Sequence, residues 1–221
     1  PPQPDESSKV KVGNRHNTSD ANPDTTSLAP LKLAELDKAS SLMPAPAPTP
    51  PGPAAIAWGR WQGVAEQGAN LNLADLMSKD YRVSVLTGDY ALLRHQSATW
   101  QVPYGGAEFG LQGSMAQVQR DGVSQLANVE NARLWVDFER SRFGTRFDLT
   151  AANLRVGLQA QGNVGSDGTF SNPSQYLDGN NMVVQGVMAN RADGGVSAGY
   201  TFQSRLDANT VATGVTLWGS K

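Results

Sequence analysis

Five residues near the C-terminus, Gly195-Val196-Ser197-Ala198-Gly199, match the G-x-S-x-G motif of hydrolases. In that motif a sharp strand-to-helix turn exposes the serine, and a catalytic histidine follows later in the chain. Here the motif continues into the alternating residues of a strand, and the two histidines, His16 and His95, both precede it. The motif therefore predicts a strand and not a catalytic nucleophile.

Two carboxylates, Asp137 and Glu139, are spaced so that both lie on one face of a strand, about 7 Å apart. Paired carboxylates can hydrolyse glycosides. The other face of the same strand is apolar, so we expect both groups to lie on a solvated outer wall. His95 has no metal-ligating or acidic partner in the sequence pattern, and we interpret it as structural.

Composition removes several further kinds of chemistry. The chain of 221 residues has no cysteine, which excludes disulfides, thiolate metal sites and cysteine nucleophiles. The Asp- and Gly-rich segments 166–170 and 178–181 lack the spacing of calcium loops and are interpreted as hairpin turns. The net charge of −2 gives no reason to expect a nucleic acid, and no apolar run is long enough for a transmembrane helix. We predict a protein without a cofactor that is not an enzyme.

The tryptophans are the best candidates for an interaction surface, because large amphipathic rings dominate many binding sites. Two of them are three residues apart and project to opposite faces of one strand, and the other three are expected at one rim. Core packing is the alternative role for each ring. The candidate surface consists of Trp58, Trp61, Trp100, Trp135 and Trp218.

From Trp58 onward the pattern of the sequence has a period of two. In one example, apolar residues at 132, 134, 136 and 138 alternate with Arg133, Trp135, Asp137 and Glu139. Such alternation over many short segments, joined by Asp-, Asn- and Gly-rich turns, predicts half-buried antiparallel strands. We expect an all-β domain over 56–221 with one short helix at 71–77. An up-and-down antiparallel β-barrel of about eight strands accounts best for this pattern, and a two-sheet sandwich is the alternative.

Residues 1–55 differ sharply from the rest in composition. All but two of the 13 prolines lie within 1–53, and every aromatic residue lies from Trp58 onward. We predict a disordered or extended arm with a possible short helix at 31–43 and a Pro-rich linker at 44–53. The arm is expected to act as a tether or docking segment, and its candidate docking residues are Leu33, Leu36 and Met43.

Several short motifs recur in order along the folded part: Trp58-Gly59-Arg60-Trp61-Gln62-Gly63, Val136-Asp137-Phe138, Gly168-Thr169-Phe170, Val184-Gln185-Gly186, Gly194-Gly195 and Gly199-Tyr200-Thr201-Phe202. Together they resemble the barrel of transferrin-binding-protein-B-like surface lipoproteins, in which each lobe pairs a handle region with an eight-stranded barrel. The same order is similar to the barrel tail of FecR-type proteins of Gram-negative envelopes, where an extended linker leads to a Trp-Gly-Arg-Trp start.

The chain departs from those lipoproteins because it lacks a lipidated cysteine and long iron-protein-binding loops. The resemblance therefore implies the barrel and an envelope location, either periplasmic or associated with the outer membrane and cell surface. It implies no residue for transferrin recognition.

Three functions are compatible with these observations. The first is a non-enzymatic extracytoplasmic module that binds another envelope protein or acts as an envelope scaffold or transducer. A homo-oligomer is compatible with this function. The second is a lipocalin-like barrel for a small ligand, in which small residues such as Gly113, Ala160 and Gly186 leave room inside. The third is an outer-membrane β-barrel with the alternation reversed and Trp218 near its C-terminus.

Overall fold

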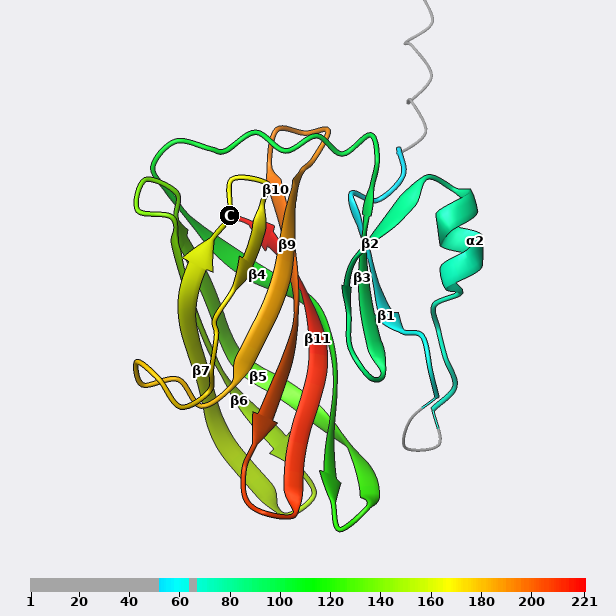
Figure 1. Ribbon diagram of the computed structural model, residues 1–221, viewed down its shortest axis with the longest axis vertical. Helices are drawn as coiled ribbons and strands as arrows, with labels where there is room; N and C mark the ends of the chain where they lie inside the picture. The colour runs from blue at the N-terminus through cyan, green and yellow to red at the C-terminus, as the bar shows by residue number, and fades with distance from the viewer. Residues whose placement is uncertain (1–51, 64–66) are drawn as a thin grey trace, which may run out of the picture. The chain divides into compact units, whose positions relative to one another are not determined.

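The computed structural model describes residues 52–63 and 67–221 (Figure 1). The predicted helix at 31–43, the docking residues Leu33, Leu36 and Met43, and all but the end of the linker 44–53 lie outside these residues. The described part is β-structure apart from one short helix. The all-β class expected from the alternating sequence is confirmed.

Eight strands close into an antiparallel barrel, in the order β10-β11-β4-β5-β6-β7-β8-β9. Each strand pairs with the next along the chain, and β11 closes the barrel by pairing with β4 from Thr210–Arg120 to Ser220–Phe109 (Figure 1). The predicted up-and-down barrel is therefore confirmed. Its strands are β4 (Gly106–Arg120), β5 (Val123–Asp137), β6 (Arg142–Ala151), β7 (Leu154–Val164), β8 (Thr169–Ser171), β9 (Val183–Asn190), β10 (Val196–Arg205) and β11 (Thr210–Ser220).

The barrel interior is a packed aromatic core, because apolar residues fill the inward positions of the alternating strands. In β5, Leu134 and Val136 are each 2% exposed, whereas Trp135 between them is 46% exposed. Edge-to-face and stacked ring pairs cross the interior, with ring centroids 4.9–6.1 Å apart: Phe143–Phe170, Phe147–Phe202, Phe170–Tyr200 and Tyr200–Trp218. These rings occupy the space that a small-ligand barrel would leave open.

Three further strands form a separate sheet in the order β1-β3-β2. They are β1 (Ile56–Arg60), β2 (Tyr81–Leu86) and β3 (Tyr90–His95). The pattern with a period of two predicts one barrel domain over 56–221, but in the structure these three strands cover part of the outer wall of the barrel. Apolar side chains from both sheets are buried together there: Ile56, Val85, Tyr90, Leu92, Val187, Ala189 and Val215.

The short helix expected at 71–77 is α2 (Leu73–Ser78), which packs on the far face of this small sheet. Asn72 caps it, since its side-chain oxygen accepts a hydrogen bond from the Asp75 N–H at 3.1 Å. Strand β3 is buried on both faces: Leu92 faces the barrel, while Ala91 and Leu93 lie under the helix. This double burial explains why β3 reads as a continuous apolar run.

Candidate functional site

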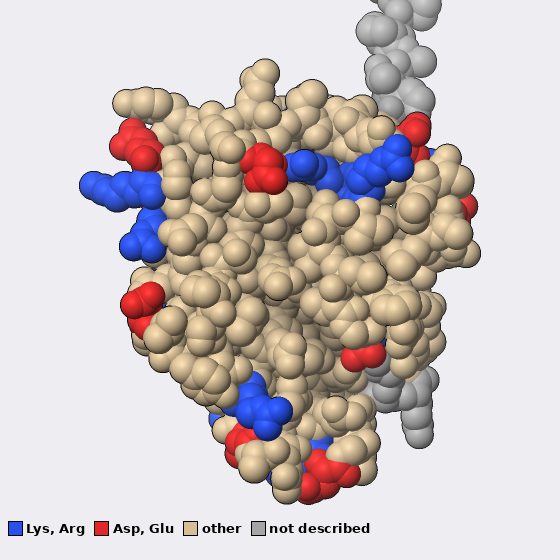
Figure 2. Space-filling view, viewed as in Figure 1, with Lys and Arg blue, Asp and Glu red and all other residues tan. Residues whose placement is uncertain are grey.

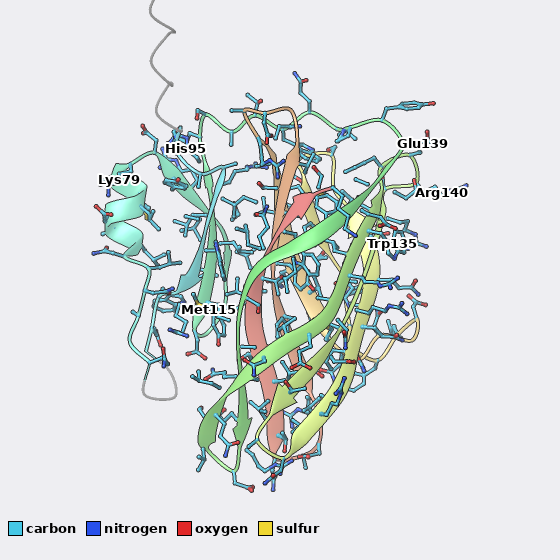
Figure 3. All side chains as sticks on the ribbon, turned by 180° about the vertical axis from the view of Figure 1, so that it is seen from behind. Lys79, His95, Met115, Trp135, Glu139 and Arg140 are labelled. Carbon is cyan, nitrogen blue, oxygen red and sulfur yellow. The ribbon has the colours of Figure 1, made fainter. Side chains whose placement is uncertain are left out.

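Trp135 projects outward from the barrel and keeps an exposed aromatic ring on its wall (Figure 3). The β5–β6 register places Trp135 opposite Gly144, and the β4–β5 register places it opposite Glu108. The indole lies across Gly144 so closely that a Cβ atom there would overlap it. Glycine is thus the residue that lets this ring rest on the neighbouring strand.

Two arginines flank this ring on the same outer face. Arg133 lies two residues before Trp135 in β5 and is directly opposite Arg146 of β6. Both side chains are exposed, and within the described residues neither guanidinium has an ion pair or a hydrogen bond. By contrast, Arg155 of the neighbouring strand reaches Asp148 at 2.8 Å. In the described part of the chain, the wall therefore presents two guanidinium groups without a bonded carboxylate beside an aromatic ring.

A loop closes the barrel where β8 is too short to do so. Strand β8 pairs with β7 only at Ser171–Asn163 and Phe170–Val164. We call residues 172–182 the seam loop, because it takes the place of a strand along the rest of β7. The side chain of Asn181 accepts from the Gln159 N–H at 2.7 Å and donates to the Gly157 carbonyl at 2.8 Å.

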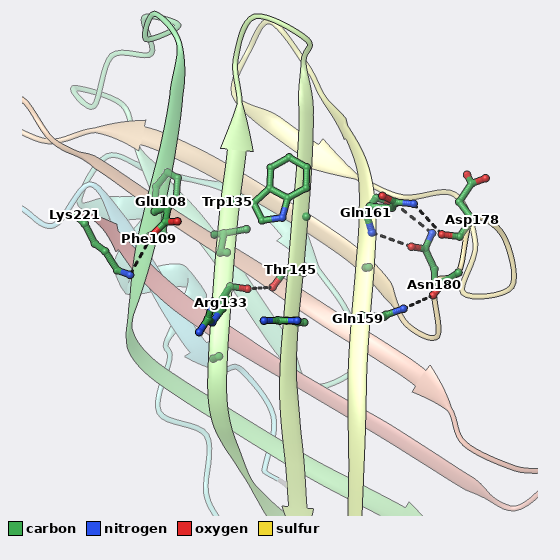
Figure 4. A pocket seen from close by; sticks show the side chains of 16 residues that line it. Glu108, Phe109, Arg133, Trp135, Thr145, Gln159, Gln161, Asp178, Asn180 and Lys221 are labelled. Atoms are coloured by element: carbon green, nitrogen blue, oxygen red, sulfur yellow. Dashed lines mark hydrogen bonds and ion pairs between the residues drawn. The ribbon is translucent and has the colours of Figure 1, made fainter.

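A second amide extends this pairing along β7. The side-chain oxygen of Asn180 accepts from the Gln161 N–H at 2.8 Å. In return, the side chains of Gln159 and Gln161 donate to the carbonyls of Gly179 and Asp178, both at 2.8 Å (Figure 4). These side-chain amides satisfy backbone groups of β7 that would otherwise form an open sheet edge.

Asn172 fixes the other side of the seam loop to β9. Its side-chain oxygen accepts from the Val184 N–H of β9 at 2.6 Å. Its nitrogen donates to the Met182 carbonyl, at the end of the loop itself, at 2.9 Å. Asn172 is only 3% exposed. The seam loop is therefore held on both sides by amide hydrogen bonds in the manner of a strand.

The outer walls of β4–β7 and the seam loop border an open groove of about 690 Å³. Figure 4 shows Trp135 and Arg133 on the floor, Glu108 and Lys221 on one side, and Asp178 on the other. The groove combines an aromatic ring, free guanidinium groups and side-chain amides. Its volume lies in the range of ligand sites, and its residue types suit binding.

The five predicted tryptophans do not form one surface. Trp58 packs against Gly113 between the small sheet and the barrel, and Trp61 lies on the far face of that sheet, donating to the Thr87 carbonyl at 3.0 Å. Trp100 packs on Phe138, and Trp218 is 0% exposed inside the barrel. Trp218 is thus corrected to a core residue, because its position in β11 points inward. Trp135 alone of the five reaches the groove.

The candidate catalytic groups have structural partners in the described residues. Ser197 lies within β10, paired with Ala189 and Gly219, with no strand-to-helix turn. The Nδ1 of His95 lies 2.7 Å from the Ser97 hydroxyl.

Asp137 closes the turn after β5. It accepts hydrogen bonds from the Arg140 backbone N–H at 2.9 Å and the Arg140 guanidinium at 2.8 Å. The backbone hydrogen bond, followed by the guanidinium, lowers the pKa of the Asp137 carboxyl. Glu139 is exposed at the same rim (Figure 3). Asp137 is therefore tied to its own turn and is not part of a carboxylate pair poised for hydrolysis.

Several residues of the groove are not predicted from the sequence. Gly144 and Arg146 matter because of the strand register, which no local pattern shows. We interpret 178–181 from the sequence as a hairpin turn, and positive φ angles of 57° at Asp178 and 75° at Gly179 do form a turn there. The turn interpretation does not predict that the next two residues, Asn180 and Asn181, bond to β7. The two adjacent asparagines are the sequence signal for this pairing.

Charged side chains on one face of the molecule gather mainly toward the two ends of the barrel, with few between them (Figure 2). Among the described residues, no helix is both long and apolar enough to cross a membrane. The same residues contain no group of three or more His, Asp or Glu side chains placed to hold a metal ion.

No family model matches this chain, and no curated protein sequence matches it. Among solved structures, it is similar to a double mutant of the vaccine antigen transferrin-binding protein B from Haemophilus parasuis, with 16% sequence identity and a TM-score of 0.42. The match covers 60% of this chain and 29% of that chain. This chain thus spans less than a third of the neighbour's length.

Proposed function

We propose that this protein is a non-enzymatic extracytoplasmic module that binds another envelope protein through the groove on its outer wall. The observation that carries this proposal is the half-exposed Trp135, which rests on Gly144 beside Arg133 and Arg146, two arginines whose guanidinium groups have no partner in the part of the chain that the structure describes. Tryptophan and arginine are enriched at the energetic centres of protein interfaces. The site is assembled on rigid strands, so little ordering is needed when a partner binds.

The seam loop carries two exposed apolar side chains just before Asp178, its first residue that lines the groove. It carries Tyr176, which is 73% exposed, and Leu177, which is 54% exposed. Exposed large apolar side chains favour a protein partner, since burying them stabilises a complex. The arm at 1–55 is proposed to serve as tether or docking segment, through Leu33, Leu36 and Met43, and the location is proposed to be periplasmic or at the outer membrane or cell surface.

The two alternatives have less support. A lipocalin-like site needs interior space, but the paired aromatic rings described above, Phe143 and Trp218 among them, fill the interior. An outer-membrane barrel presents an apolar band outward, whereas β5–β7 present Arg133, Arg146, Gln159 and Gln161. The resemblance to FecR-type tails stays a prediction.

Affinity capture from an envelope extract of the source organism tests the proposal. The baits are the full chain, a Trp135→Ala variant, and a Tyr104→Ala variant as control, because Tyr104 is an aromatic residue that is 95% exposed and outside the groove. We expect an envelope protein that the full chain and Tyr104→Ala retain and that Trp135→Ala loses. Equal retention by all three baits would place the binding site elsewhere. A Leu33→Ser, Leu36→Ser, Met43→Ser variant tests the arm in the same way.

A further inference from the structure

Arg133 and Arg146 form an unusual pair on the barrel wall. Directly opposite residues on antiparallel strands have Cβ atoms about 5 Å apart, and like charges placed so are destabilising. Both side chains point outward, because the residues beside them, Leu134 and Thr145, are buried in the barrel. Nearby arginines on this side of the barrel have partners: Arg155 binds Asp148 at 2.8 Å and Arg142 binds Asn163 at 3.2 Å.

A carboxylate is the group that would relieve this repulsion. A guanidinium presents a planar set of donors that match the two oxygens of a carboxylate, and such charge-assisted hydrogen bonds are strong. The nearest carboxylate of β6, Asp148, is two residues from Arg146 and accepts hydrogen bonds from Asn131 and Arg155 instead. The acidic groups of the groove do not bind the pair either. Glu108 lies toward Lys221, whose Nζ is 3.5 Å away, and Asp178 lies on the seam loop across β7 (Figure 4).

The distance from the arginine pair to the tryptophan fixes the spacing of a ligand. Arg133 and Trp135 are two residues apart on one face of β5, so they are about 7 Å apart along the strand. In an extended peptide, side chains at positions i and i+2 also share one face and have the same separation. A segment lying along β5 would place an acidic side chain on the arginines and its second neighbour on the indole.

We infer that the groove recognises an extended segment of a partner protein, with a Glu or Asp side chain held by Arg133 and Arg146 and a large apolar side chain, two residues away, on Trp135. This inference rests on the proposed function and names the chemistry of its partner. The Gln159 and Gln161 side chains, anchored to the seam loop, border the path of this segment.

An array of 12-residue peptides tests the inference with the full chain. Each peptide is built from Ser and Gly with one Glu, and one Phe placed one, two or three residues from it. We expect the tightest binding for the spacing of two, and at least a tenfold loss when the Glu is replaced by Gln. Binding should also weaken as salt rises from about 50 to 300 mM, because the contact is charged and partly exposed.

An Arg133→Gln, Arg146→Gln variant completes the design. We expect it to lose about tenfold in affinity for the Glu peptide and almost nothing for the Gln peptide. Arg155→Gln is the control, since it removes an arginine of the adjoining strand that already has a partner. The double variant should unfold at the same temperature as the wild type or a higher one, because a repulsive pair is removed.

Equal affinity for the Glu and Gln peptides, or equal binding by the double variant and the wild type, would overturn the inference. Binding of polygalacturonate but of no peptide would overturn it as well, in favour of an acidic sugar. These failures are separable from failure of the proposed function. If capture of an envelope protein depends on Trp135 but not on either arginine, the proposed function stands and the acidic segment is wrong.

Discussion

The indole of Trp135 lies across Gly144 on the neighbouring strand, in the space where any other residue would place its Cβ atom. A ring that covers a cross-strand glycine shields the backbone and replaces the side-chain contacts that the glycine lacks. The arrangement holds an exposed tryptophan in one position before any partner binds.

Substitution of the glycine is expected to displace this ring. We predict that Gly144→Ala lowers the free energy of unfolding by about 1 kcal/mol, because the added methyl group forces the indole away from the wall. Gly157→Ala is the control, since the nearest atom to its added Cβ is a carboxylate oxygen of Asp148 at 3.9 Å. Urea unfolding and the NMR signal of the Trp135 indole N–H measure the two effects. Equal stability and an unmoved signal in Gly144→Ala would contradict this packing.

The seam loop leads to a second prediction, about closure of the barrel. Asn181→Ala removes an acceptor for the Gln159 N–H and a donor for the Gly157 carbonyl. We expect the free energy of unfolding to fall by about 0.5–1.5 kcal/mol, because two backbone groups of β7 exchange a protein partner for water. Amide hydrogen exchange at Gln159 should become faster, while exchange in β10 stays slow.

Asn153→Ala is a matched control for this change. Asn153 is exposed in the turn between β6 and β7, and its side chain has no hydrogen bond within the described residues. It should change stability by less than about 0.5 kcal/mol. If Asn181→Ala were as stable as Asn153→Ala, the contact between the seam loop and β7 would not depend on the side-chain amide of Asn181.

The alternation of apolar and polar residues, together with the short turns, predicts the barrel, with a two-sheet sandwich as the alternative. Leu134 and Val136 point inward and Trp135 outward, as the period of two requires. The same logic does not separate β3 from the barrel. It has apolar residues on both faces, and sequence alone does not say whether such a strand is covered by a barrel or by a helix.

The candidate site could be predicted only in part for a related reason. Trp135 was identified from its residue type, but its partners depend on register. Between Glu130 and Arg133 the β5–β6 register shifts, and Asn131 there has a φ of 51°. Arg133 faces Arg146 and the ring meets Gly144 because the register continues unbroken from the β5–β6 turn, where Asp137 pairs with Arg142, as far as this bulge. No local sequence pattern shows both the length of that turn and the position of the bulge.

The contact between the small sheet and the barrel provides a third prediction. Leu92 is 0% exposed and packs with the barrel residues Val187 and Val215. We predict that Leu92→Ala lowers the free energy of unfolding by about 2–5 kcal/mol, because it leaves a cavity in that contact. Leu86→Ala is the control, since Leu86 is 50% exposed on the same sheet.

Urea unfolding followed by two probes tests this contact. Exchange of the β3 amides reports on the small sheet, and near-UV circular dichroism reports on the aromatic core of the barrel. We expect β3 to lose protection at lower urea than the barrel in Leu92→Ala. The opposite outcome is that β3 and the barrel unfold at the same urea concentration in Leu92→Ala, with the midpoint of the wild type. That result would show that Leu92 does not join the two sheets.

Tyr90 gives a prediction about alkaline pH. Burial, and secondarily the neighbouring Asp89, raises the pKa of its phenol from 10.0 to about 12. The neutral form is therefore favoured in the folded state, so its contribution to stability is complete below pH 10 and is lost as pH rises from about 10 to 12. For a shift of this size the wild type should lose about 1.4 kcal/mol from this group at pH 11.

Tyr90→Phe should not show the part of the stability loss at alkaline pH that comes from the Tyr90 phenol. At pH 7 the variant should be as stable as the wild type or more stable, because the Tyr90 hydroxyl is buried without a hydrogen-bond partner in the described residues. Some pH dependence should persist, since burial also raises the pKa of Tyr200. Urea midpoints at pH 8, 10 and 11 measure the difference in stability between the wild type and Tyr90→Phe. Tyr104→Phe is the control, because Tyr104 is 95% exposed. Parallel pH profiles for wild type and Tyr90→Phe would mean that the Tyr90 hydroxyl reaches solvent.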